Sequence, residues 1–296
     1  MINYLKYKIK NFLNFNKRQL GEIQLLLKKK DYSKITNIRD AELKVFSQNG
    51  EDGIIDFLLF KIKKKNAVTF IEIGVEDYEE SNTRFLVETR PCTGLLIDVN
   101  TQINFIKKRN FYWKNDLYIF TKKINPENIC EILDEYDFTK KSDIFSIDID
   151  GLDYWVLKAA NLSKISIVVA EYNPLFGSKY PITIPYLKNF ERDPKKKSYF
   201  GMSINASIDL MKSKGFFFVG ANTTCCNAFF INNKYKENFE NLEINNLDEY
   251  VDFKFRENKS DLYAENKVSF LKDGISEQYV FFLPSNDLKK IKDINL

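Results

Sequence analysis

The chain has 296 residues, of which 44% are hydrophobic and 29% are charged, so it has enough apolar material to bury a large core. It contains no histidine, which excludes Ser-His-Asp and Cys-His catalysis, histidine metal sites and a histidine general base. Its 45 basic residues nearly balance its 41 acidic residues and are interspersed with them, which disfavours a nucleic-acid partner.

Three parts follow one another along the chain. In residues 1–43, apolar residues recur at helical spacing with lysines between them, which predicts a helical arm with a helix over residues 1–30. This basic amphipathic helix could contact a membrane surface or a partner. The favoured alternative is an arm that packs on the main domain or on a second copy of the chain in a homo-oligomer. Residues 44–235 form the predicted main domain, and residues 236–296 a mixed C-terminal appendage.

The main domain alternates strand and helix signals. Continuous apolar runs predict strands at 68–74, 94–98, 117–121, 143–148 and 165–170, with closing strands at 216–219 and 228–231. Helices are predicted at 53–63, 154–160 and 204–214. The pattern is typical of an α/β fold with a mostly parallel, Rossmann-like sheet covered on both faces, in which ligands bind at the carboxyl ends of the strands.

Four cysteines, Cys92, Cys130, Cys225 and Cys226, form no CxxC pair, and no secretory signal precedes them. No apolar stretch approaches the roughly 18–20 residues of a membrane span. Reduced thiols and a cytoplasmic location are therefore expected.

Acidic residues follow the first two predicted strands. Glu72 and Gly74 end the first, and the acidic loop 75–82 that follows lacks the later glycines of GxGxxG. Such a loop disfavours a dinucleotide pyrophosphate and suits a cationic ligand with an amino group. Asp98 ends the second strand, where a carboxylate can accept hydrogen bonds from both ribose hydroxyls.

Further polar residues end the next two neighbouring strands. Asp148 and Asp150 follow one strand, and Glu171 and Asn173 follow the other. Because adjacent parallel strands end side by side, these four side chains are expected to converge. A hard cation such as Mg²⁺ or Mn²⁺ would offset the cost of burying their charge. The alternative is that Asp150 or Asp153 caps the following helix, and a cap is the expected role of Asp153.

Several segments together resemble one enzyme family. Residues 145–158 resemble the K-I-D-V-E-G-x-E-x-x-V-L-K motif of FkbM-type S-adenosylmethionine-dependent methyltransferases, with Asp150 in place of the family glutamate. Residues 46–52 look like their S-Q-x-G-E-D segment, and residues 70–74 are similar to motif I of class I methyltransferases. Residues 171–174 and 222–230 resemble segments of related bacterial proteins, so the resemblance covers about residues 44–232.

The resemblance implies a seven-stranded sheet whose last strand is antiparallel, and methyl transfer, commonly to a hydroxyl. Members often belong to bacterial surface-polysaccharide gene clusters. The S-adenosylmethionine residues carried over from the family are Gln48, Glu51, Glu72, Gly74, Ser81, Asn82, Asp98, Ile124, Asn125 and Asp148. The metal set, which resembles that of catechol and macrolide-sugar O-methyltransferases, is Asp148, Glu171 and Asn173.

The expected function is O-methylation of a sugar hydroxyl, with a nucleotide-linked surface-polysaccharide precursor such as a GDP-heptose as the substrate. Catalysis would use Asp148, Asp150 and Glu171, through a bound divalent ion or through Asp150 or Glu171 as a direct base. The long loop 174–200 is expected to cover the site, and the predicted substrate residues are Tyr180, Tyr186, Arg192, Asn222 and Asn227. Two alternatives remain open, namely an amine, amide or phosphate-linked acceptor, and a non-catalytic membrane-peripheral assembly protein.

Overall fold

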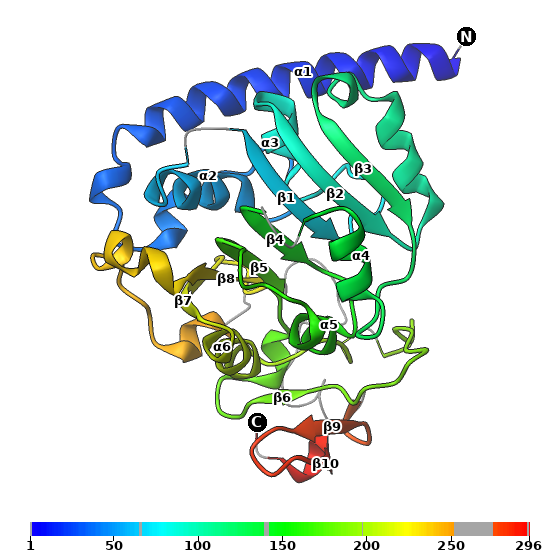
Figure 1. Cartoon of the computed structure of the whole chain (residues 1–296), viewed down its shortest axis with the longest axis vertical. Coiled ribbons are helices and arrows are strands. Elements are labelled where there is room, and N and C mark those ends of the chain that lie inside the picture. Colours follow the sequence, from blue (N-terminus) through cyan, green and yellow to red (C-terminus); the bar gives the residue numbers. More distant parts are fainter. Residues whose placement is uncertain (1, 65–66, 139–141, 197, 252–274, 295) are drawn as a thin grey trace.

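A seven-stranded sheet organises the molecule in the computed structural model, which describes residues 2–64, 67–138, 142–196, 198–251, 275–294 and 296 (Figure 1). The strand order is β3-β2-β1-β4-β5-β8-β7. Its strands are β1 (Val68–Ile73), β2 (Cys92–Asp98), β3 (Asp116–Thr121), β4 (Ile144–Ile147), β5 (Ile167–Glu171), β7 (Phe216–Ala221) and β8 (Asn227–Asn232). The first five run parallel, and β8 pairs antiparallel with both β5 and β7. The predicted α/β fold, a Rossmann-like sheet of seven mostly parallel strands with its last strand antiparallel, is confirmed.

Helices cover both faces of this sheet because side chains alternate along each strand. Ile71 and Ile73 of β1 pack into one apolar cluster with α4, α5 and α6, whereas Val68 and Phe70 pack into a second cluster with α2 and α3. The helices are α1 (Ile2–Lys29), α2 (Glu51–Lys61), α3 (Arg84–Thr89), α4 (Ile129–Glu135), α5 (Asp153–Ala159) and α6 (Ile204–Ser213).

Short elements complete the fold. A small second sheet joins β6 (Ile182–Thr183) to the C-terminal hairpin of β9 (Tyr279–Phe282) and β10 (Asp287–Lys290). The 3₁₀ turns are Tyr32–Lys34, Ile38–Ala41, Thr101–Lys108, Tyr112–Lys114, Pro174–Phe176, Asn233–Phe239, Leu247–Tyr250 and Ile291–Asp293.

The division into an arm, a main domain and an appendage stays a prediction. Of the predicted appendage, residues 252–274 and 295 lie outside the described residues, and Val280 and Ile291 pack into the same apolar cluster as α5 and α6. Residue 1 of the arm and residue 197 of the predicted covering loop are also outside the description. Over the described part of the chain, no helix has the length and apolar character needed to cross a membrane.

The sheet register brings the predicted strand-end residues together. Ile73 pairs with Ile97 on one side and with Ile147 on the other, and Ile147 pairs in turn with Ala170. The residues that follow these four, namely Gly74, Asp98, Asp148 and Glu171, therefore lie in a row at the carboxyl edge of the sheet.

Gly74 closes β1 against the neighbouring strand end. Its φ is +84°, and a Cβ added there would lie 1.6 Å from the carbonyl oxygen of Asp148. Gly201 has a similar φ of +65°, but no atom lies within 4 Å of its added Cβ. Gly74 is therefore required for close backbone approach as well as for its positive φ.

Gly74→Ala is expected to destabilise the protein much more than Gly201→Ala. The Gly201 substitution pays only the left-handed backbone cost of about 1–2 kcal/mol, whereas the Gly74 substitution also forces the β4 end away. Urea unfolding of both variants measures the difference. Equal losses of unfolding free energy would contradict the collision seen at Gly74.

Candidate functional site

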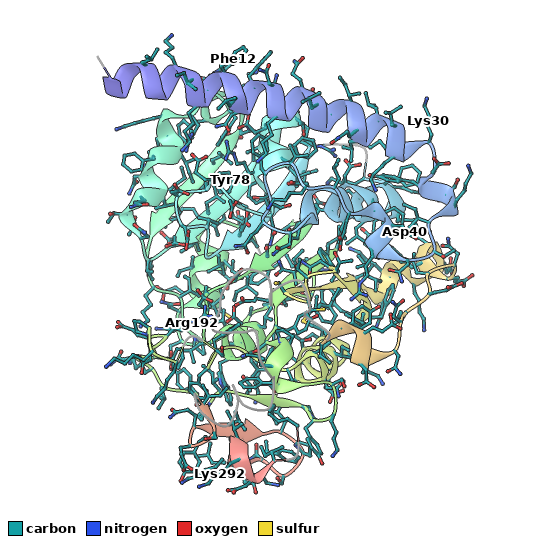
Figure 2. The ribbon with its side chains drawn as sticks, turned by 180° about the vertical axis from the view of Figure 1, so that it is seen from behind. Phe12, Lys30, Asp40, Tyr78, Arg192 and Lys292 are labelled. Atoms are coloured by element: carbon teal, nitrogen blue, oxygen red, sulfur yellow. The ribbon has the colours of Figure 1, made fainter. Side chains whose placement is uncertain are left out.

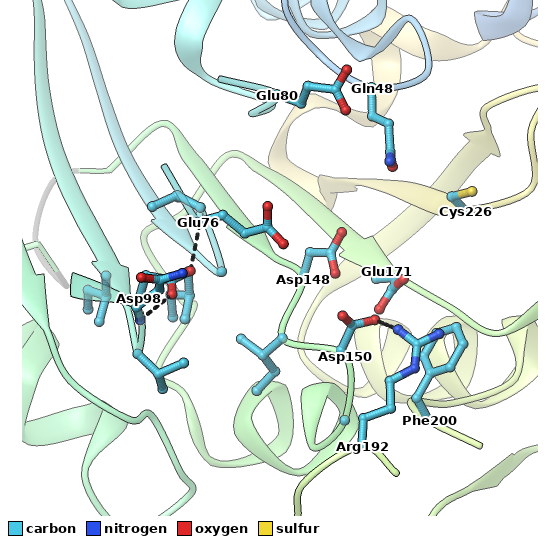
Figure 3. A pocket seen from close by; sticks show the side chains of 18 of the residues that line it. Gln48, Glu76, Glu80, Asp98, Asp148, Asp150, Glu171, Arg192, Phe200 and Cys226 are labelled. Carbon is cyan, nitrogen blue, oxygen red and sulfur yellow. Dashed lines mark hydrogen bonds and ion pairs between the residues drawn. The ribbon is translucent and has the colours of Figure 1, made fainter. Parts of the chain in front are cut away.

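A large cavity opens at the carboxyl ends of β1, β2, β4 and β5 (Figure 3). Its volume is about 1450 Å³, beyond the roughly 300–1,000 Å³ of a typical small-molecule site. The cavity is therefore larger than one small ligand requires. Among the predicted residues, it is lined by Gln48, Gly74, Asp98, Ile124, Asp148, Asp150, Glu171 and Arg192.

The lining of this cavity is mainly acidic. Eight acidic residues contribute, namely Glu42, Glu76, Glu80, Asp98, Asp148, Asp150, Glu171 and Glu191, against four basic ones, Lys44, Lys122, Lys123 and Arg192. This excess of negative charge favours a ligand that carries positive charge. It agrees with the expectation drawn from the acidic loop after Gly74.

Asp98 lies on one side of the cavity with both carboxylate oxygens held in place. The backbone amide of Glu76 donates to Oδ2 over 2.7 Å, and that of Asn100 donates to Oδ1 over 2.6 Å. Each oxygen of a carboxylate has about two acceptor sites, so both can accept a further hydrogen bond. Asp98 is thus a fixed acceptor suited to a pair of neighbouring hydroxyls.

Three carboxylates meet on the other side of the cavity. Asp148, Asp150 and Glu171 each place an oxygen within 4.8 Å of the others (Figure 3). Glu171 is buried, and its Oε2 has no hydrogen-bond partner among the described residues. A buried carboxylate oxygen left in this way is costly unless a ligand compensates it.

The electrostatics of this group reflect burial and mutual repulsion. Burial, followed by the charges of Asp150 and Asp153, raises the pKa of Asp148 to about 8. Burial and the charge of Asp148 raise the pKa of Glu171 well above its ordinary value. Without a cation, the pair therefore retains a proton near neutral pH.

Asp153 shapes the turn that carries Asp150. Its carboxylate accepts hydrogen bonds from the backbone amides of Ile149 and Gly151, each over 3.0 Å. Asp150 itself has a φ of +52°, which aspartate tolerates better than most residues. The turn after β4 thereby presents Asp150 beside Asp148 at the start of α5.

Arg192 reaches into the cavity from the loop after β6. Its guanidinium forms an ion pair with Asp150 and lies 4.2 Å from the ring centroid of Phe200 (Figure 3). The arrangement holds a flat cation at the edge of the carboxylate group. A ligand anion in the cavity would compete with Asp150 for this side chain.

Glu72 faces its own loop and does not line the cavity. Its carboxylate accepts hydrogen bonds from Ser81 Oγ over 2.7 Å, from the Asn82 amide over 2.8 Å and from the Thr83 amide over 3.1 Å. Burial raises its pKa above the ordinary value. Glu72, Ser81 and Asn82 therefore shape the loop beside the cavity, and their predicted contact with a cofactor stays a prediction.

Glu51 is likewise fully buried and engaged with other predicted site residues. It accepts hydrogen bonds from Asn222 Nδ2 over 2.7 Å, from Asn227 Nδ2 over 2.8 Å and from the Asn49 amide over 2.8 Å. The three predicted residues do converge, but on each other. These hydrogen bonds join the start of α2 to the β7–β8 connection.

Other predicted residues lie outside the cavity lining. Asn173 is buried, donates to the carbonyls of Ser198 and Phe200 and accepts from the Leu175 amide, and its predicted role as a metal ligand stays a prediction. Asn125 caps the turn before α4 by accepting from the amides of Glu127 and Asn128.

Tyr180 and Tyr186 also lie away from the cavity. Tyr180 packs against Phe282 of β9 with ring centroids 5.3 Å apart, and the Tyr186 hydroxyl donates to Glu127 over 2.5 Å. Both side chains attach the 174–200 loop to its surroundings.

Sequence reasoning did not single out several lining residues. They include Glu42, Glu76, Glu80, Asn100, Lys123, Thr223, Thr224 and Cys226. Glu76 and Glu80 belong to the acidic loop already noted, and Thr223 and Thr224 to the segment 222–230. For these residues the sequence indicated the right segment, and the structure shows which side chains of that segment line the cavity.

Comparisons with known proteins place the chain only distantly. No family model and no curated protein sequence matches it. Among solved structures, the N-terminal domain of EvdMO1 in the presence of SAH and D-fucose has 10% identity over 62% of this chain and 82% of that chain, with a TM-score of 0.40. A putative O-methyltransferase from Klebsiella pneumoniae has 12% identity over 60% and 78%, with a TM-score of 0.33. An O-methyltransferase family protein from Burkholderia thailandensis has 13% identity over 60% and 54%, with a TM-score of 0.34. Likenesses this distant leave the functional argument to the chain's own residues.

Proposed function

We propose that the protein is an S-adenosylmethionine-dependent O-methyltransferase of FkbM type that acts on a sugar hydroxyl, with a divalent ion held by Asp148, Asp150 and Glu171. The observation that carries this proposal is that one cavity combines a fixed acceptor for a diol, Asp98, with a separate group of three carboxylates. The acceptor proposed is a nucleotide-linked sugar, such as a surface-polysaccharide precursor.

The cofactor part of the proposal depends on Asp98 and Gly74. Asp98 offers acceptors for two neighbouring hydroxyls, as a ribose requires, and the tight turn at Gly74 brings backbone to the cavity wall. The acidic lining complements a ligand with an ammonium and a sulfonium. The residues present therefore fit this cofactor.

The metal part of the proposal depends on the chemistry of the carboxylate ligands. Three carboxylates with oxygens within 4.8 Å, one of them with an unpaired buried oxygen, match the oxygen ligands that Mg²⁺ and Mn²⁺ prefer. When bound, S-adenosylmethionine supplies a methyl group on a sulfonium and leaves as a neutral thioether, while a divalent ion makes a coordinated hydroxyl more acidic. The task of the carboxylates is to hold the ion and orient the hydroxyl.

The acceptor part of the proposal follows from the absence of histidine in the chain and from the position of Arg192. A sugar hydroxyl needs help to lose its proton, and carboxylates are the acid–base groups that this side of the cavity offers. Arg192 and Lys123, also in the lining, are suited to a phosphate on the acceptor. A nucleotide-linked sugar satisfies both requirements.

Calorimetry with S-adenosylmethionine, followed by methylation assays over nucleotide sugars with Mg²⁺ or with EDTA, tests the proposal. We expect calorimetry to detect binding of the cofactor, and turnover that stops in EDTA. Absence of cofactor binding by the folded protein would reject the function itself. Turnover unchanged in EDTA would reject the metal and leave Asp150 or Glu171 as a direct base.

A further inference from the structure

The long N-terminal helix α1 lies along the body of the molecule (Figure 1). Lys10 pairs with Glu79 over 2.9 Å, Lys29 pairs with Asp56 over 3.1 Å, and Lys28 donates to the Asp40 carbonyl over 2.7 Å. Two small or apolar positions, Gly21 and Leu25, are buried in the same contact. The helix is thus attached to the body mainly by charged groups.

The opposite side of α1 is apolar and exposed. Nine large apolar side chains lie there, each between 50% and 64% exposed, namely Leu5, Ile9, Phe12, Leu13, Phe15, Leu20, Ile23, Leu26 and Leu27. Most are spaced three or four residues apart, so they form one continuous stripe along the helix. A stripe of this length on a folded protein marks a surface that meets another apolar phase.

The charge of α1 indicates which kind of apolar surface it contacts. The segment Ile2–Lys29 contains seven lysine and arginine residues and one acidic residue, Glu22. The whole chain has 45 basic and 41 acidic residues, so the remainder is slightly acidic and α1 accounts for the positive balance. A second copy of the chain would bring two cationic helices together, whereas an anionic lipid surface complements both the stripe and the charge.

We propose that α1 lies in the surface of an anionic bilayer, with its apolar stripe (the nine residues named above) among the acyl chains. The lysine and arginine residues of α1 supply the positive charge that lipid phosphates would meet. The proposal concerns a surface apart from the methyltransferase cavity and does not depend on that function.

Docking through α1 leaves the cavity accessible. The helix lies along one end of the molecule in both views, and Arg192, which lines the cavity, lies well below it (Figures 1 and 2). The bound protein would therefore take a water-soluble substrate at the membrane surface.

Flotation of the full chain with vesicles tests the proposal. We expect binding to phosphatidylcholine vesicles that contain phosphatidylglycerol, weak binding to phosphatidylcholine alone, and weaker binding at high salt. The double variant Phe12→Glu with Leu20→Glu is expected to lose binding by on the order of a hundredfold. The matched control Leu187→Glu with Leu288→Glu, two exposed leucines elsewhere, should bind as the parent does.

Light scattering of the same proteins distinguishes lipid from a second copy. Unchanged mass and unfolding temperature in the α1 variant, together with lost flotation, support the lipid surface. A dimer that the α1 substitutions dissociate, or equal flotation with neutral and anionic vesicles, would overturn the proposal.

Discussion

Glu171→Gln is expected to stabilise the metal-free protein at pH 8 and to abolish its stabilisation by Mg²⁺ or Mn²⁺. Burial and the charge of Asp148 raise the pKa of Glu171 well above its ordinary value, so folding at pH 8 must place a proton on a side chain that is ionised in the unfolded chain, and this proton uptake costs free energy. Glutamine is neutral in both states and removes that cost, which we expect to raise the free energy of unfolding by at least about 1.4 kcal/mol, the equivalent of one pKa unit. The same change removes a ligand, so added ion should no longer protect the fold.

The pH dependence of the parent protein has a defined sign. The folded-state pKa of Asp148 is raised to about 8 and that of Glu171 is raised well above its ordinary value, mainly by burial. Between about pH 4 and pH 8 the folded protein therefore binds more protons than the unfolded chain, and stability falls as pH rises through this window. A bound divalent ion should offset most of that fall.

Thermal unfolding at pH 6 and pH 8, with and without each ion, measures both effects. Asp209→Asn, an exposed residue of α6, serves as the control and should behave as the parent does. Asp148→Asn should act in the same direction as Glu171→Gln. Stabilisation by Mg²⁺ that persists undiminished in both cluster variants would place the ion elsewhere.

Much of the fold could be predicted because parallel strands buried on both faces are continuous apolar runs. The predicted strands of the main sheet match β1–β5, β7 and β8 to within a few residues, and the helix over 1–30 matches α1. The small sheet was not predicted, since β6 has two residues and pairs with β9 about a hundred residues later. No local pattern reports a pairing of that kind.

The site was predictable where the rule of strand ends applies directly. Asp98, Asp148, Asp150 and Glu171 each follow a predicted strand and do line one cavity. Glu51 shows the limit, because a polar residue near a cavity can turn inward to satisfy buried groups. Its carboxylate binds Asn222 and Asn227, and sequence alone does not say which way such a side chain turns.

Asp98→Ala is expected to weaken S-adenosylmethionine binding by about tenfold to a hundredfold while the protein stays folded. Hydrogen bonds to a charged acceptor are worth about 1.5–3 kcal/mol each. The carboxylate is positioned by the amides of Glu76 and Asn100, so it is ordered before any ligand arrives. Asp98→Asn keeps the shape and one acceptor, and it should lose less affinity.

A second ligand distinguishes loss of the contact between Asp98 and the ribose from a general disruption of the cavity. S-adenosylhomocysteine lacking the ribose 2′-hydroxyl should bind the parent more weakly than the full ligand does, but the Asp98→Ala variant should bind the two alike. Calorimetry measures all four combinations, with Asp116→Asn, an exposed residue of β3, as the control for charge. If the variant still distinguishes the two ligands as strongly as the parent does, Asp98 does not bind the ribose. The carboxylates around Asp148 would then be the alternative ribose site, since they also line the cavity.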